Sequence, residues 1–165
     1  MSLLNDISLG VHFFKIAKIL REAMLINGML FCADVWYNVS EQNLRKMEKI
    51  DESLLRKIIN AHSKTAIEAL YLELGCFPIR FHLMSKRVNY LHYILNFKKS
   101  DLLSKFFEAQ SKNPTKGDWI LQVIEDLNSL GISTDFDKIR KYKKNTFKNL
   151  VKEKTKSLAL KYLNN

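Results

Sequence analysis

Residues that break regular secondary structure are scarce in this sequence: of 165 residues, only five are glycine and two are proline. Cysteine is equally scarce. Cys32 and Cys76 lie far apart with no CxxC spacing, which argues against a disulfide-rich secreted domain and a cysteine zinc finger. The longest uncharged apolar run, residues 23–33, contains Asn27 and Gly28 and is too short to span a bilayer. The first residues also lack the basic region of a secretory signal. We therefore expect an intracellular protein, nuclear or cytoplasmic, with no membrane partner.

Acidic residues are almost absent from the last part of the chain. Residues 1–137 carry 17 basic and 16 acidic side chains, whereas residues 138–165 carry ten basic side chains and Glu153 as the single acidic one. The net charge of +10 is therefore a property of the C-terminal segment. With 47% hydrophobic residues, the chain is also able to bury a core. We expect a helical domain over residues 1–132 and a basic helical segment over 133–165 that packs on it.

Apolar residues recur at steps of three and four through most of the chain, which is the spacing of an α-helix. No stretch shows the sustained alternation typical of a strand, so we predict a compact all-α fold of about six to seven helices, the last one basic. The expected helices cover residues 7–30, 40–58, 65–75, 78–95, 100–112 and 118–131, followed by a lysine-rich helix or pair of helices out to 163. The first helix is expected to loosen at Gly28 and to bury a stripe made of Ile7, Val11, Phe14, Ala17, Leu20, Ala23 and Met24.

Several residues suit the ends of these helices. Thr65 and Glu68 have the spacing of a capping box, in which each side chain bonds the backbone amide of the other residue. Glycines after an apolar stripe favour a left-handed helix end. The other expected N-terminal caps are Ser40, Asp118 and Thr134 with Asp137, and the expected C-terminal stops are Gly75 and Gly131.

The sequence shows no catalytic or metal-binding constellation. The four histidines, His12, His62, His82 and His92, form neither HxxxH nor HExxH, and we expect them to face solvent or to bond helix caps. No glycine-rich phosphate loop is present. We therefore expect no enzyme activity, no metal, no cofactor and no small-molecule substrate.

Other polar and aromatic residues have ordinary structural interpretations. The carboxylates Glu48, Asp51 and Glu52 lie among basic residues at helical spacing, which predicts a solvated face with weak ion pairs. The two cysteines are expected to be small core residues. Trp36 and Tyr37 follow an apolar run and are expected to anchor the core rather than to stack on bases.

The lysine-rich segment is the strongest physical signal in the sequence. Lys141, Lys144, Lys148 and Lys152 recur at steps of three and four, so a helix over residues 137–163 would place them on one ridge. Such a ridge suits a phosphate backbone, because each lysine that pairs with a phosphate releases condensed counterions. A solvated surface helix is an equal alternative, and attachment to a membrane surface is a weaker one.

A series of blocks between residues 20 and 132 resembles the region after the polymerase core in reverse transcriptases of non-LTR retrotransposons. LFCADVWYN resembles that family's LYGxExW block, with Cys32 where the family has glycine, and YLELG and NPTKGDWILQVIEDLNSLGI resemble later blocks. The matching residues are Leu30, Phe31, Asp34 and Trp36; Leu54, Leu55, Arg56, Lys57 and Ile58; Leu70, Tyr71, Glu73, Leu74 and Gly75; and Arg80, Lys86 and Arg87.

The resemblance implies a helical part of an RNA-directed DNA polymerase from a transposable element. It implies that the part supports template RNA or primer DNA and adjoins the polymerase core of the same or a longer chain. Asp34 is not part of a polymerase Asp-Asp turn, because a single carboxylate beside Val35 does not bridge two metal ions. We therefore expect a non-catalytic domain that contacts RNA or DNA through phosphates. The expected contacts are Lys141, Lys144, Lys148 and Lys152, with Arg80, Lys86 and Arg87 as a second patch.

A different class of function is also compatible with the same segment. In that alternative the chain is a helical protein-interaction module with no nucleic-acid role, and the lysines only keep it soluble. Its docking surface would be the apolar stripe Phe147, Leu150, Val151 and Leu158, which enters a groove of the partner.

Overall fold

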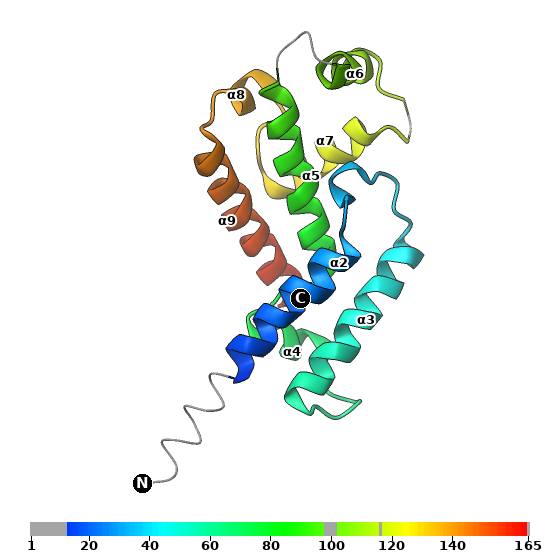
Figure 1. Ribbon diagram of the computed structural model, residues 1–165, viewed down its shortest axis with the longest axis vertical. Helices are drawn as coiled ribbons and strands as arrows, with labels where there is room; N and C mark the ends of the chain where they lie inside the picture. Colours follow the sequence, from blue (N-terminus) through cyan, green and yellow to red (C-terminus); the bar gives the residue numbers. More distant parts are fainter. Residues whose placement is uncertain (1–12, 98–101, 116, 165) are drawn as a thin grey trace.

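The computed structural model describes residues 13–97, 102–115 and 117–164 (Figure 1). Throughout these residues the chain forms helices joined by loops and turns, with no strand, which confirms the all-α prediction. The long helix α5 (Ile79–Leu95) runs through the middle of the molecule. The helices α3 (Glu41–Ile59), α7 (Trp119–Leu130) and α9 (Lys144–Leu163) all pack against it.

The first helix departs from the expected pattern. Residues 13–29 are helical, but Arg21–Ile26 (η1) form a wider π-helix, in which the Asn27 amide donates to the Glu22 carbonyl, before α2 (Asn27–Met29). The part of the prediction over residues 7–12 lies outside the described residues. The helix widens at η1, whereas Gly28 lies within α2, so the expected position of the irregularity was wrong.

The buried stripe predicted for this helix is only partly correct. Ala17 is buried as expected, and Ala23 is exposed. Phe14, Leu20 and Met24 are 40%, 51% and 74% exposed. Arg21 and Ile26 are buried instead. The extra residue in the π-turn shifts the helical register, and Arg21 finds a buried carboxylate partner, so the face that points inward differs from the most apolar one.

The helix ends were predicted with mixed success in α3 and in α4 (Ile67–Leu74). The Ser40 hydroxyl accepts a bond from the Asn43 amide at 3.2 Å, which confirms this cap. The capping box of Thr65 and Glu68 was wrong. Ala66 is extended, with ψ of 133°, so the helix begins one residue later and Glu68 is too close to its start to reach back. Gly75 ends α4 with φ of 57°, as expected.

At the N-termini of two later helices, the capping hydrogen bonds differ from those predicted. Asp118 precedes α7, but its carboxylate accepts bonds from the amide and hydroxyl of Thr115 rather than from the helix. Asp135, and not Thr134, caps the short helix α8 (Phe136–Arg140), where it accepts from two amides. Gly131 ends α7 with φ of 63°, as predicted.

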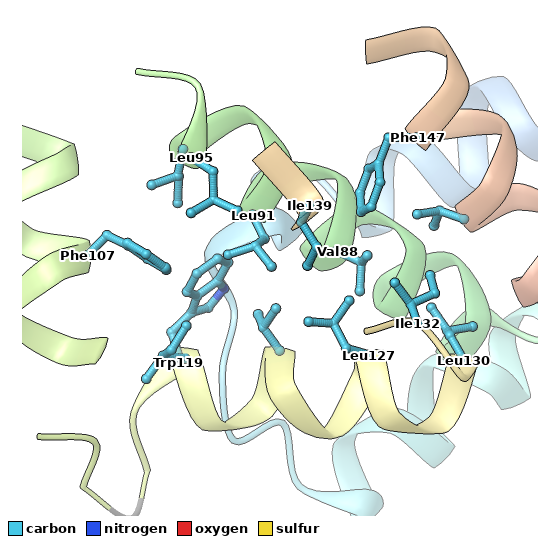
Figure 2. Close-up of a cluster of buried hydrophobic side chains, with 14 residues drawn as sticks. Val88, Leu91, Leu95, Phe107, Trp119, Leu127, Leu130, Ile132, Ile139 and Phe147 are labelled. Carbon is cyan, nitrogen blue, oxygen red and sulfur yellow. The ribbon is translucent and has the colours of Figure 1, made fainter. Parts of the chain in front are cut away.

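One large hydrophobic cluster joins both parts of the chain (Figure 2). It contains Val88 and Leu91 from α5, Leu127 from α7, and Phe147 and Val151 from α9. Phe107 of α6 (Leu102–Lys112) closes one side. Each large side chain buried here contributes roughly 1.5–3 kcal/mol. The basic C-terminal segment is therefore packed into the same core as the preceding helices.

Candidate nucleic-acid interface

The lysine-rich segment is a pair of helices with a break between them. α8 ends at Arg140, Lys141 is its C-terminal cap, and Lys143 is extended with ψ of 143° before α9 begins. Closely spaced like charges along residues 138–144 disfavour a continuous helix here. The prediction that Lys141 belongs to the lysine ridge was therefore wrong.

The remaining three lysines of the ridge, Lys144, Lys148 and Lys152, lie on α9 at intervals of four residues. They line two neighbouring depressions between α5 and α9, with volumes of about 690 and 620 Å³. Lys86 on α5, which was predicted for a second patch, lines the larger one from the opposite side. Both depressions share Lys148 and two residues of α5, so they form one surface.

We call this surface the α5/α9 groove. It is defined by Asp34, by Ser85, Lys86, Asn89, His92, Tyr93 and Asn96 on and after α5, and by Tyr142, Lys143, Lys144, Asn145, Lys148, Asn149 and Lys152 on and before α9.

The groove carries a strong excess of positive charge. Five lysines line it, and Asp34 at one end is the single carboxylate among its lining residues. Within the described ranges, none of these five lysines forms an ion pair. The lysines on α9 are exposed and Lys86 is half-buried. The charges of the groove are thus free to bind an anionic ligand.

Arg80 and Arg87 do not join this groove. Arg80 donates two bonds to Glu48 of α3, at 2.7 and 2.8 Å, and one to Glu41. These bonds, chiefly those to Glu48, raise the pKa of Arg80. Arg87 is buried and bonds both carboxylate oxygens of Asp126 on α7, at 2.6 and 2.9 Å. The two arginines hold α5 to its neighbours, and a phosphate contact by the buried Arg87 would require breaking its pair with Asp126.

A buried ion pair that the sequence analysis missed lies beneath the first helix. Arg21 donates two bonds of 2.6 Å to Asp51, and the Tyr71 hydroxyl donates to the same carboxylate at 2.9 Å. Burial lowers the pKa of Arg21, but the bond and charge of Asp51 outweigh it, so the pKa is raised overall. Burial beside Asp51 also raises the pKa of Tyr71. The three groups are shielded from solvent, so their role is to hold helices together.

The prediction of a solvated carboxylate face on α3 was therefore wrong. Asp51 is fully buried and Glu48 is 4% exposed. A signal for this was present, because Asp51 lies on the apolar stripe of α3, at steps of three and four among Leu44, Met47, Leu55 and Ile58. A carboxylate on such a stripe needs a buried cationic partner.

Other polar residues were placed correctly only in part. His62 is exposed. His92 is buried and stacks on Phe147 with ring centres 4.7 Å apart, and its Nε2 lies 3.4 Å from the side-chain amide of Asn96, the C-cap of α5, so it contacts a helix cap as expected. His12 lies outside the described residues. Cys76 is buried as predicted, whereas Cys32 is exposed.

The prediction that Trp36 and Tyr37 both anchor the core is correct only for Trp36. Trp36 packs against a small core cluster, but Tyr37 is 56% exposed and does not anchor the core.

No group of three or more histidine, cysteine, aspartate or glutamate side chains in the described ranges is arranged to hold a metal ion. A search of the same residues for a helix that is long and apolar enough to cross a membrane found none.

Comparisons with known proteins gave no match. No family model, no curated protein and no solved structure is significantly similar to this chain.

Proposed function

We propose that this chain is a non-catalytic helical domain that binds RNA or DNA by its phosphates in the α5/α9 groove. The observation that carries the proposal is the arrangement of five lysines on both sides of one groove, none of which forms an ion pair with the part of the chain that the structure describes. Lysine side chains that face a groove bind a phosphate backbone without reading its sequence.

The uncharged residues of the groove suit the same ligand. Asn89, Asn145 and Asn149 carry amides that are able to bond phosphate or sugar oxygens. Tyr93 and Tyr142 lie at one end and are 53% and 41% exposed. Exposed aromatic rings beside a basic groove offer stacking surfaces for unpaired bases of any sequence. A strand with single-stranded character is therefore the preferred ligand.

We further propose that the domain belongs to a reverse transcriptase of the non-LTR retrotransposon type and works beside its polymerase core. The support is the order of sequence blocks and one backbone conformation. Cys32 has φ of 54°, in the left-handed region that favours glycine, and it stands where that family's block has glycine.

The alternative function, a protein-interaction module, was predicted to dock through an apolar stripe of α9, but this stripe packs into the core. Phe147 and Val151 are fully buried, and Leu150 and Leu158 pack against the same core. A docking partner would have to use a different surface, because this stripe is already covered by the chain itself.

Salt-dependent binding tests the proposed function. We expect the purified chain to bind an RNA hairpin with a single-stranded extension and an RNA/DNA duplex, with log affinity falling linearly with log salt. The variant K144Q/K148Q/K152Q should lose affinity, with a slope smaller by roughly 0.7–0.9 for each lost phosphate contact.

The matched control is K46Q/K49Q/K57Q, which removes the same charge from exposed lysines of α3. It should retain the wild-type slope. Absence of binding by the wild-type chain at low salt would overturn the proposal, and equal losses in the two triple variants would exclude the groove as the site.

A further inference from the structure

The α5/α9 groove leads into a third cavity, with a volume of about 320 Å³, where the C-terminal half of α9 approaches the first helix and the start of α5. Ser85 and Lys152 line both this cavity and the groove. The cavity lacks the tyrosines and asparagines that line the groove, and its walls include Phe77 and Phe81.

Two buried side-chain polar atoms lack a hydrogen-bond partner in the described part of the chain, and both belong to residues that line this cavity. They are Thr155 Oγ1 and His82 Nε2. Thr155 is only 7% exposed. An unpartnered buried polar group is unfavourable for folding, so two of them around one cavity indicate a site that a polar ligand completes.

The charges around the cavity define the ligand. Lys18, Lys152 and Lys156 contribute three positive charges, and Glu22 contributes one negative charge. Glu22 already lies 3.3 Å from Arg21 Nη1 and 3.9 Å from His82 Nε2. An excess of positive charge with two unused polar atoms suits a small dianion with several acceptor oxygens.

A terminal phosphate monoester has these properties. It carries a charge of roughly −1.5 to −2 at pH 7 and three acceptor oxygens, whereas an internal phosphate diester carries a single charge. The Thr155 hydroxyl is able to donate to it. Burial lowers the pKa of His82, and a neutral ring that carries its proton on Nε2 also donates one hydrogen bond to the phosphate.

We propose that this cavity receives the terminal phosphate of a nucleic-acid strand that lies in the α5/α9 groove, so that the domain recognises strand ends. The inference rests on the proposed function. Lys152 and Lys156, one helical turn apart, balance the charge, and Thr155 and His82 supply hydrogen bonds that a terminal hydroxyl does not fully use.

The test uses one oligonucleotide in three forms: with a 5′-phosphate, with a 3′-phosphate, and with hydroxyls at both ends. We expect the wild-type chain to bind one phosphorylated form about tenfold or more tightly than the hydroxyl form. The preferred form identifies the end that is bound. An internal fluorescent label keeps both ends free.

Matched variants distinguish binding of the terminal phosphate in the cavity from electrostatic attraction of the strand to the lysines of the groove. T155V keeps the shape and charge of the cavity, and we expect it to reduce the phosphate preference severalfold, because it weakens binding of the phosphorylated form more than binding of the hydroxyl form. H82Q should reduce the preference in the same way and serves as a second variant. T146V changes an exposed threonine of α9 outside the cavity and should behave as wild type. Thermal melting establishes that each variant is folded.

The outcomes distinguish this inference from the function on which it rests. Equal binding of all three forms, or a phosphate preference that persists in both T155V and H82Q, would overturn the terminal-phosphate site and leave binding in the groove intact. Failure of every form to bind at low salt would overturn both.

Discussion

Arg21 and Asp51, 30 residues apart in sequence, are joined by two hydrogen bonds of 2.6 Å and are both shielded from solvent. The pair fastens the π-helical part of the first helix to the middle of α3. Tyr71 of α4 bonds the same carboxylate, so one buried aspartate connects three helical segments.

Replacing Asp51 with asparagine should therefore be strongly destabilising. D51N keeps the shape but leaves the buried Arg21 guanidinium with only the partly exposed Glu22 as a counter-charge, and we expect a loss of about 3–5 kcal/mol in the free energy of unfolding. Urea denaturation followed by circular dichroism measures it. The control E41Q removes an exposed carboxylate that also bonds arginines, and it should cost less than about 1 kcal/mol. Similar losses in both variants would contradict the role assigned to the buried pair.

Phe147 tests whether the basic C-terminal segment belongs to the main core. Its ring is fully buried and packs on His92. F147A should cost about 3–5 kcal/mol and should shift the unfolding transitions seen by circular dichroism and by tryptophan fluorescence together. F106A, at a ring that is 60% exposed, is the matched control and should change stability little. Separate transitions in F147A would mean that α9 unfolds independently.

Cys32 is a position where a smaller residue should stabilise the fold. Its φ of 54° is unfavourable for a residue with a Cβ atom, and its side chain is exposed, so little packing is lost on substitution. We expect C32G to raise the free energy of unfolding by about 1 kcal/mol. C32A removes the thiol but keeps the Cβ atom and should show no such gain. A stabilisation of equal size in C32A would assign the effect to the thiol.

The cap of α8 should make part of the stability depend on pH. Asp135 accepts bonds from the amides of Lys138 and Asp137, and these bonds lower its pKa below the ordinary value of 3.8. A carboxylate whose pKa is lower in the folded state stabilises the protein above the unfolded pKa, and this contribution is lost as pH falls through the folded value. The stability difference between wild type and D135N should therefore be constant above about pH 5 and shrink below about pH 4. A difference that does not change with pH would contradict this assignment.

The helices and several of their ends could be predicted because the signals are local. The apolar spacing of α3, the Ser40 hydroxyl and the glycines at positions 75 and 131 act within a few residues of themselves. The shared face of Lys144 and Lys148 follows from helical spacing in the same way.

The features that were missed depend on contacts between distant segments. No pattern in the sequence predicts the π-turn at residues 21–26. This turn determines that Arg21 points inward and Leu20 outward. The cavity around Thr155 arises only when α9 lies against α5 and the first helix. Lys86 and Lys148 are also brought to one groove by packing, which spacing along either helix does not specify.

The π-helical segment sets which way the preceding turns face. Each residue of an α-helix advances the chain by about 100° around its axis, so one additional residue in a turn rotates everything before it by about that angle. Deleting a single residue between Arg21 and Ile26 would restore ordinary helical phase and turn residues 13–20 by roughly a quarter of a circle. The number of residues between Arg21 and Ile26 thus sets the orientation of the apolar side chains Phe13, Ile16 and Leu20. A deletion there would alter the exposed surface while residues 13–20 themselves stay unchanged.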